Sequence, residues 1–328
     1  MVSLFTQTRG TRIAAGAYAL LLAHVAAANT YPTRPIRIIV PQTPGGTADS
    51  MARILAPSLS AALGQQLVID NRGGAGGIIG TELVARATPD GYTLSFNGAG
   101  PLTISPNIQK VMPYDPVRDF QAVSMTTVSP FALVVHPSLR ARTVKELIAL
   151  AKAESGKLNY ASAGSSSVVF LGMELLKSMA GINILHVPYK GTAQGLTDVM
   201  AGQVSMLLFT VAPALQHAAA ERVRVLGVTS AKRSAQRPDI PTIAEAGLAG
   251  YAVTTWTGLL APANTLREII TRLHEGVVKS LRTPQARVQL DAQGVDIADG
   301  MPEEFAAFIK EELARHARVL KLAGAKME

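Results

Sequence analysis

The sequence predicts an α/β protein built on a parallel sheet, and two observations carry that prediction. Short runs rich in β-branched residues alternate with stretches whose apolar residues recur at helical spacing. The chain has 328 residues, and at roughly 100–200 residues per domain this length favours two domains. Alternating strands and helices favour parallel pairing. The predicted strands cover residues 36–40, 67–70, 93–96, 133–135, 184–187, 204–209 and 223–229.

Two of the predicted helices have clear start signals. Thr143 and Glu146 form a Ser/Thr-x-x-Glu capping box ahead of an apolar stripe that runs to Ala153. The last helix begins near Pro302, carries apolar residues at helical spacing and ends near Gly324. We expect the apolar face of this last helix to be buried in the core, because most such stripes face the protein's own interior.

The first 28 residues have the layout of a secretory signal peptide. Arg9 and Arg12 precede an apolar run that ends in three alanines, and we expect cleavage near Ala28 and an exported, periplasmic mature chain. A membrane anchor is the alternative interpretation. The run holds about 16 residues with His24 inside it, however, which is short of the roughly 20 needed to span a bilayer.

Composition excludes several classes of protein. Hydrophobic residues make up 48% of the chain and charged residues 16%, which excludes intrinsic disorder. The absence of cysteine excludes disulfide scaffolds, thiolate zinc sites and thiol nucleophiles. Loss of residues 1–28 removes two arginines, which leaves 29 Lys and Arg against 23 Asp and Glu, a formal charge of +6. Because these cations are scattered, we expect no nucleic-acid partner and a bias toward small anions.

The first glycine loop follows a strand and precedes a helix. The strand over 36–40 runs into Pro44, Gly45, Gly46 and Thr47, after which apolar residues take helical spacing. Glycines let main-chain N–H groups converge, and a helix N-terminus adds free donors and partial positive charge, so this loop suits a carboxylate or phosphate. Asp49 either joins this ligand site or caps the helix donors itself.

A second glycine-rich segment over 71–80 invites comparison with a dinucleotide site. Its glycines have the spacing G-x-G-x-x-x-G instead of G-x-G-x-x-G, and the next strand ends at Asn97 without the acid that holds a ribose hydroxyl. The sequence therefore disfavours a nucleotide site. Two interpretations remain open for this segment, a turn that admits close helix packing and a ligand loop.

A third polar loop repeats the order of strand, loop and helix. Its residues Ser162, Gly164, Ser165, Ser166 and Ser167 offer hydroxyl groups ahead of an apolar helical stripe. We predict that this loop binds a second anionic or polar group, while ordinary serine capping of the helix is the alternative. Two loops of the same geometry suggest two lobes that face each other.

Catalytic and metal motifs are not evident. His274 and Glu275 lack the second histidine of H-E-x-x-H, and Ser165 is not followed by the final glycine of G-x-S-x-G. We therefore expect no catalytic residue, no metal site and no cofactor. A Ser–His pair assembled by folding stays open, since such sites are defined by geometry. An exported serine hydrolase and a nucleotide-binding α/β enzyme are accordingly kept as alternatives.

Many short motifs follow one another in a fixed order across residues 31–328. They are Tyr31-Pro32, Pro35-Ile36-Arg37-Ile38-Ile39-Val40-Pro41, Pro44-Gly45-Gly46 with Asp49, Leu63-Gly64-Gln65, Asn71-Arg72, Gly74-Ala75-Gly76-Gly77, Pro89-Asp90-Gly91-Tyr92-Thr93-Leu94, Tyr114-Asp115-Pro116, Val134-Val135-His136-Pro137, Gly156-Lys157-Leu158-Asn159-Tyr160, His186-Val187-Pro188-Tyr189-Lys190-Gly191, Val228-Thr229-Ser230-Ala231-Lys232-Arg233 and Pro302-Glu303-Glu304-Phe305. Together they resemble one family, the substrate-binding receptors of tripartite tricarboxylate transporters, or Bug receptors.

The resemblance implies a fold of the type II periplasmic-binding-protein class, with two α/β lobes joined by two crossings. We expect the crossings near residues 124–130 and 250–255, which gives lobe one as 29–128 plus 253–328 and lobe two as 129–252. Trp256 resembles the start of the family's return strand, and a packed aromatic at the lobe boundary is the simpler interpretation of it.

The resemblance also implies a function. It implies a non-catalytic receptor, expected to be a monomer, that binds a small organic acid between the lobes and hands it to a membrane permease of the tripartite tricarboxylate type or to a sensor. The first and third loops map onto the family's two facing ligand loops. Phe209 and Thr210 stand where the family often carries an acid or amide. With Asp49 the one acid in the loops, we predict a carboxylate ligand without an amine.

Overall fold

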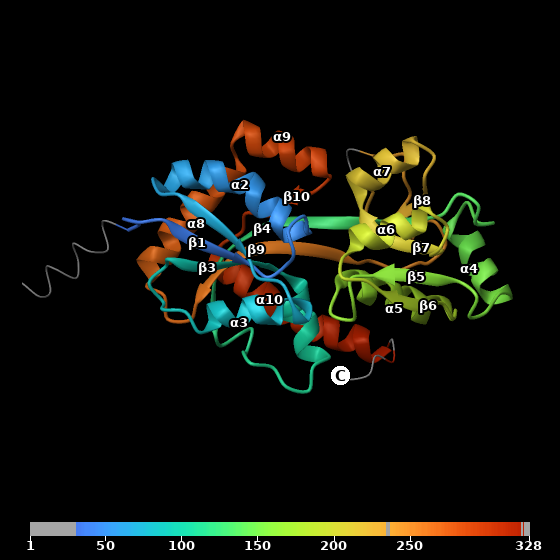
Figure 1. Cartoon of the computed structure of the whole chain (residues 1–328), viewed down its shortest axis with the longest axis horizontal. Helices are drawn as coiled ribbons and strands as arrows, with labels where there is room; N and C mark the ends of the chain where they lie inside the picture. Colours follow the sequence, from blue (N-terminus) through green and yellow to red (C-terminus); the bar gives the residue numbers. More distant parts are fainter. Residues whose placement is uncertain (1–30, 234–236, 323, 325–328) are drawn as a thin grey trace, which may run out of the picture.

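The computed structural model describes residues 31–233, 237–322 and 324; the predicted signal peptide over 1–28 lies outside them. Figure 1 shows a molecule with two halves side by side and two long strands running between them. The elements are β1 (Ile36–Val40), α2 (Thr47–Leu63), β2 (Leu67–Asn71), η1 (Ala75–Gly77), α3 (Ile78–Ala85), β3 (Thr93–Gly98), η2 (Gly100–Ile104), η3 (Ser105–Asn107), β4 (Phe120–Val135), α4 (Val144–Ala153), β5 (Asn159–Ser162), α5 (Val168–Ala180), β6 (Leu185–Pro188), α6 (Thr192–Met200), β7 (Met206–Thr210), α7 (Val211–Ala219), β8 (Arg224–Val228), β9 (Thr254–Pro262), α8 (Arg267–Leu281), α9 (Pro284–Gln293), β10 (Asp296–Ile297) and α10 (Pro302–Leu322).

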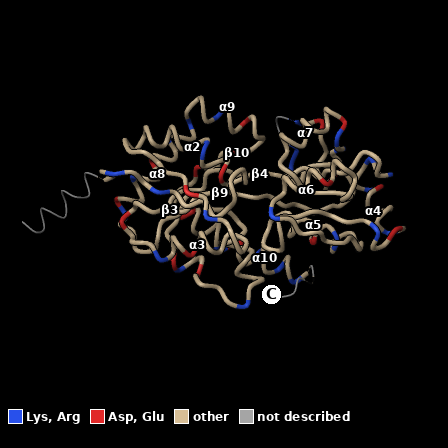
Figure 2. Tube along the Cα trace, viewed as in Figure 1, with Lys and Arg blue, Asp and Glu red and all other residues tan. Residues whose placement is uncertain are grey.

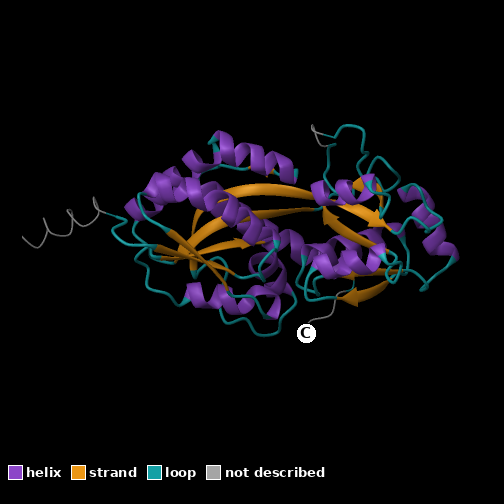
Figure 3. Cartoon of the chain, turned by 45° about the horizontal axis from the view of Figure 1, so that its top comes forward, coloured by secondary structure: helices purple, strands orange, loops and turns teal. Residues whose placement is uncertain are grey.

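The strands form one continuous path in the order β2-β1-β3-β9-β4-β7-β5-β6, with β8 and β10 each paired to β4. Pairing is parallel within β2-β1-β3 and within β7-β5-β6. It is antiparallel wherever β4 or β9 takes part. The α/β class is therefore confirmed, and the prediction of a purely parallel sheet is wrong. Figure 3 shows helices covering both faces of the strands.

The long strand β4 accounts for the mixed pairing. Its first part, Phe120 to Pro130, pairs with β9 in one half of the molecule. Its second part, Phe131 to Val135, pairs with β7 and β8 in the other half. The sequence predicted only residues 133–135 as a strand, because the preceding segment is rich in Ser and Thr and shows no continuous apolar run. Tertiary pairing on both sides overrides that weak local signal.

Helix boundaries follow local sequence signals. Thr143 Oγ1 accepts a hydrogen bond from the Glu146 N–H at 3.1 Å, which confirms Thr143 as the N-cap of α4, while the Glu146 carboxylate accepts from the Arg142 N–H at 2.7 Å instead of from Thr143. Helix α2 ends at Gly64, which has φ of +75° and donates its N–H to the Ser60 carbonyl at 2.9 Å. The last helix begins at Pro302, as predicted.

Helix α10 holds the two halves together. Its residues Phe305 and Ile309 are buried, which confirms the prediction of a core-facing stripe. The Phe305 ring meets Trp256 of β9 edge to face at 5.5 Å between ring centroids. At its far end, the Leu322 carbonyl accepts a hydrogen bond from Ser178 of α5. Within the part of the chain that the structure describes, no helix has the length and apolar character to span a membrane.

Candidate functional site

A cavity of about 510 Å³ lies between the two halves, within the range typical of small-ligand sites. Its walls come from loops at the carboxyl ends of β1, β3, β5, β6 and β7, which is where open α/β sheets bind ligands. The lining residues are Pro41, Gln42, Thr43, Gly46, Thr47, Ala48, Gly73, Gly74, Ala75, Gly76, Gly77, Gly98, Ala99, Gly100, Pro101, Phe131, Ala163, Ser166, Ser167, Val168, Val169, Tyr189, Lys190, Gly191, Thr192, Leu208, Phe209, Thr210, Thr255, Trp256 and Thr257.

The predicted ligand residues divide into two groups. The cavity brings together Gly46, Thr47, Ser166, Ser167, Phe209 and Thr210. The residues outside its lining are Pro44, Gly45, Asp49, Ser162, Gly164 and Ser165. The first and third loops therefore do face one cavity, with Pro44 and Gly45 of the first loop and Gly164 and Ser165 of the third outside its lining.

Asp49 is fully engaged inside the protein. Its carboxylate accepts hydrogen bonds from the Gly45 N–H at 2.8 Å, from Arg53 at 2.9 Å and from the Asn71 amide at 3.0 Å. Burial raises the pKa of Asp49, but these three donors outweigh burial and hold its pKa below the usual value. Asp49 therefore shapes the first loop, where Gly45 has φ of +83°, and leaves no free oxygen for a ligand amine.

Gln42 caps helix α2, which sequence reasoning missed. Its side-chain oxygen accepts a hydrogen bond from the Ala48 N–H at 3.0 Å, so Asp49 is not the cap. Gly46 has ordinary extended dihedrals, with φ of −70°, so a larger residue there would not strain the backbone. A Cβ at Gly46 would instead lie 2.6 Å from the Gln42 side-chain oxygen. This contact joins residues six apart in the chain, a spacing that the usual capping signals do not cover.

The second glycine-rich segment serves both of the roles left open by the sequence. Residues 73–77 line the cavity, so the segment forms part of the site wall. A Cβ at Gly76 would lie 2.7 Å from the Cβ of Ser166, so only glycine allows the two loops to meet. Gly80 serves packing, because a Cβ there would lie 2.4 Å from the Arg72 carbonyl oxygen.

The serine loop caps the N-terminus of helix α5. Ser167 Oγ accepts a hydrogen bond from the Phe170 N–H at 3.1 Å, which is the capping alternative raised from the sequence. Folding also assembles a Ser–His pair, since Ser162 Oγ lies 2.6 Å from His186 Nε2. Ser162 is completely buried and its hydroxyl also accepts from the Gly164 N–H. A hydroxyl that no substrate can reach is not a nucleophile, so this pair is structural.

Tyr189 and Trp256 line the cavity and carry polar groups, although the sequence did not predict them as ligand residues. Tyr189 donates its hydroxyl to Asp198 at 2.6 Å, and this hydrogen bond raises the pKa of Tyr189 to about 12. The indole N–H of Trp256 is buried and has no hydrogen-bond partner.

Lys190 also lines the cavity, and among the described lining residues it carries the only charge. Elsewhere, acidic and basic residues are interspersed over both halves of the molecule (Figure 2). The site thus combines one cation with main-chain and hydroxyl groups. This arrangement can bind an anion.

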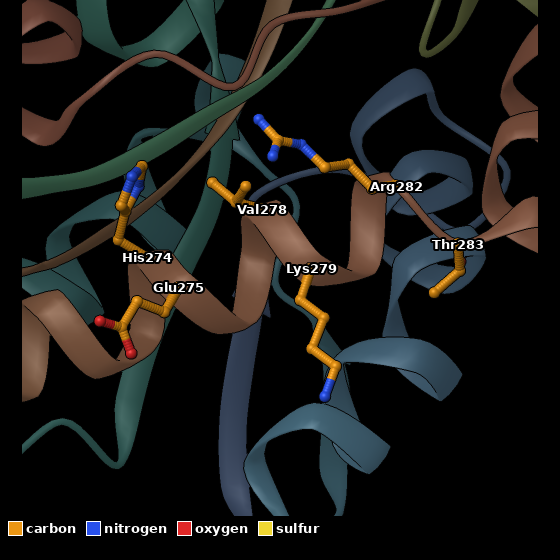
Figure 4. Close-up of a pocket in the computed structure, with 6 residues that line it drawn as sticks. All are labelled: His274, Glu275, Val278, Lys279, Arg282 and Thr283. Carbon is orange, nitrogen blue, oxygen red and sulfur yellow. The ribbon is translucent and has the colours of Figure 1, made fainter.

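A second depression, of about 480 Å³, lies along α8 (Figure 4). Its polar side chains are partly engaged already, because His274 Nδ1 contacts the Val123 carbonyl and Arg282 pairs with Asp299 at 2.9 Å. It is lined by Glu275, Val278, Lys279 and Thr283 as well, so one helix and its end supply the whole lining. Across the described residues, no cluster of three or more His, Cys, Asp or Glu could hold a metal ion.

Two α/β lobes around a cavity that suits an anion define a solute-binding receptor of the periplasmic type. The family model of the tripartite tricarboxylate transporter family receptor matches residues 51–325, and the chain belongs to this family. It is 40% identical over 89% of its length to the UPF0065 protein in the tcbD-tcbE intergenic region of Pseudomonas sp., of which it covers 87%. It is 35% identical over 92% of its length to protein BugT of Bordetella pertussis, of which it covers 93%.

Solved structures agree with this membership. The Rhodopseudomonas palustris protein Rpa4515 with adipate is 36% identical, with a TM-score of 0.86 over 91% of this chain and 100% of that one. MatC from the same organism, with bound malate, is 29% identical, with a TM-score of 0.82 over 88% of this chain and 100% of that one. Proteins of this family are periplasmic solute-binding receptors and not enzymes, which confirms the non-catalytic prediction.

Proposed function

We propose that this chain binds a small organic carboxylate in the cavity between its lobes and delivers it to a membrane permease or a sensor. The observation that carries the proposal is the lining itself, where glycine main chain and serine hydroxyls face a single lysine. The relatives solved with adipate and with malate support a carboxylate as the ligand class. We propose that Gly46, Thr47, Ser166, Ser167, Phe209 and Thr210 contact it.

A calorimetric titration of the purified mature protein tests the binding proposal. Adipate and malate are the probes, and NAD is the negative control. A ligand at one hundred times its Kd stabilises the folded state by about 2.7 kcal/mol, so thermal melting gives a second measurement. Trp256 lines the cavity and is the chain's only tryptophan, so its fluorescence reports binding as well. Stabilisation by NAD alone would overturn the proposal.

We propose further that residues 1–28 are removed on export and that the mature protein acts as a monomer in the periplasm. The charged start, apolar run and alanines of this segment support export, and the family's receptors are periplasmic. N-terminal sequencing of protein from the periplasmic fraction tests this proposal, together with size-exclusion chromatography. An intact Met1 on exported protein would contradict it.

We propose lobe bounds of 29–128 plus 253–328 for lobe one and 129–252 for lobe two. The pairing of β4 supports this division, because its partner changes from β9 to β7 between Pro130 and Phe131. Hydrogen exchange followed by mass spectrometry tests it: protection within 129–252 is expected to change as a unit when denaturant is added. Protection that changes in unison over both lobes would contradict the division.

A further inference from the structure

The charge balance of the cavity is one-sided. Among the described residues of its lining, Lys190 is charged and no Asp or Glu is present. Two acids beside lining residues are already engaged: Asp49, which follows Ala48, accepts from Gly45, Arg53 and Asn71, and Asp198 accepts from the Tyr189 hydroxyl. A ligand in this cavity therefore meets an uncompensated positive charge.

Lys190 has no hydrogen bond or ion pair to any described residue, in contrast to Lys177, which pairs with Glu174 at 2.6 Å. It stands at the carboxyl end of β6 and just before Gly191, the residue that precedes helix α6. Both Lys190 and Gly191 line the cavity. Because its ammonium is not committed within the protein, Lys190 is free to pair with a carboxylate that enters.

An amino acid is expected to bind in this cavity more weakly than a carboxylate without an amine. Its ammonium group would sit in a cavity whose one charge is also positive, and repulsion adds to the cost of removing that ammonium from water. Serine, threonine and main-chain oxygens are neutral acceptors, and they offset this cost only in part. A carboxylate without an amine meets no such penalty.

We infer that Lys190 is a specificity-determining residue of the cavity: it pairs with a ligand carboxylate and, in a lining without acids, selects carboxylates that lack an amine. The inference rests on the proposed function and extends it, since it names the residue that discriminates and the ligand class that is rejected. It applies to linear dicarboxylates such as adipate and excludes their 2-amino derivatives.

Calorimetry with adipate and 2-aminoadipate tests the inference, because the two probes differ by one amine. The wild-type protein is expected to bind adipate at least tenfold more tightly. Lys190→Gln is expected to weaken adipate binding about five- to tenfold and to reduce the preference for adipate over 2-aminoadipate. Lys190→Arg keeps the charge and is expected to stay within about threefold of the wild-type affinity.

The matched control is Lys152→Gln on α4, which makes the same charge change at an exposed position outside the cavity lining. It is expected to leave adipate affinity unchanged. Equal adipate affinity in the wild-type and Lys190→Gln proteins would overturn the inference while leaving the proposed function in place. So would tighter binding of 2-aminoadipate by the wild type. A wild-type protein that binds neither of these probes nor malate would overturn both. Melting curves show whether Lys190→Gln folds, which is expected because Lys190 is exposed.

Discussion

The two walls of the cavity are built from different chemistry. The wall from lobe one, called here the glycine wall, exposes more main chain, since its lining includes Gly46, Gly73, Gly74, Gly76, Gly77, Gly98 and Gly100. The wall from lobe two is mostly side chain, with Ser166, Tyr189, Lys190, Phe209 and Thr210. A main-chain wall changes little when a sequence changes, whereas a side-chain wall changes with each substitution. The difference suggests that lobe one supplies general anion binding and lobe two supplies selectivity.

The largest expected effect concerns the packing behind the glycine wall. Gly80→Ala places a Cβ 2.4 Å from the Arg72 carbonyl and 3.0 Å from Pro41, both of them main-chain groups that cannot move alone. We expect a loss of about 2–3 kcal/mol in the free energy of unfolding, measured by urea denaturation. Gly191→Ala in the other wall is the control, because a Cβ there meets nothing within 4 Å. Equal losses in the two variants would remove the contrast between the walls.

The next effect is a pH dependence of stability that arises from His316, which packs behind the glycine wall. His316 of α10 is completely buried and contacts Thr103 of η2 at 2.9 Å, and η2 begins with the lining residues Gly100 and Pro101. Burial lowers the pKa of His316 to about 4. The unfolded chain protonates this histidine near pH 6.5, so the stability it contributes is complete above that pH and is lost as the pH falls toward 4.

The expected loss from His316 is about 2 kcal/mol between pH 8 and pH 5. Glutamine does not titrate, so the free energy of unfolding of His316→Gln is expected to fall by about 2 kcal/mol less than that of the wild type between pH 8 and pH 5. Urea denaturation of both proteins at the two pH values measures the difference. Parallel pH profiles would show that burial of His316 does not govern the acid sensitivity of this region.

The next effect is on ligand affinity and concerns the contact between Gly76 of lobe one and Ser166 of lobe two. Gly76 has φ of +65°, and a Cβ there would press against Ser166 at 2.7 Å. We expect Gly76→Ala to weaken adipate binding about tenfold, because the added methyl separates the two walls and the left-handed backbone costs about 1 kcal/mol for alanine. The double variant Gly76→Ala with Ser166→Gly is expected to recover part of the affinity. No recovery would place the defect in the backbone of Gly76 alone.

The smallest expected effect concerns Gln42, a lining residue of lobe one whose side chain caps α2. Gln42→Ala removes the acceptor of the Ala48 N–H, and we expect a loss of about 1 kcal/mol in the free energy of unfolding. Gln66→Ala, at an exposed position before β2, is expected to change stability by less than about 0.5 kcal/mol. Thermal melting compares the two variants. A loss as small as that of Gln66→Ala would mean that water replaces the cap.

The sequence by itself determined the local units of this protein. Helix α2 and the N-cap at Thr143 depend on hydrogen bonds between near neighbours, so residue spacing predicts them, and the strand at 36–40 follows from its run of β-branched residues. The ordered stretches that resemble the receptor family predicted the two-lobed fold and the non-catalytic role, which the family match confirms.

Only the tertiary structure decided which parts of those units meet. β4 became one strand of 16 residues because partners on both sides pair with it, although the sequence predicted a strand only at its end, over 133–135. Gly76 and Ser166 are far apart in the chain and touch in the fold. The sequence named Asp49 as a candidate ligand residue and gave Lys190 no role, whereas in the structure Lys190 lines the cavity and Asp49 does not. The surroundings of each charge decide its role: Asp49 is satisfied by its near neighbours Gly45 and Arg53 and by Asn71 of the adjacent strand β2, whereas Lys190 lines a cavity that holds no acid.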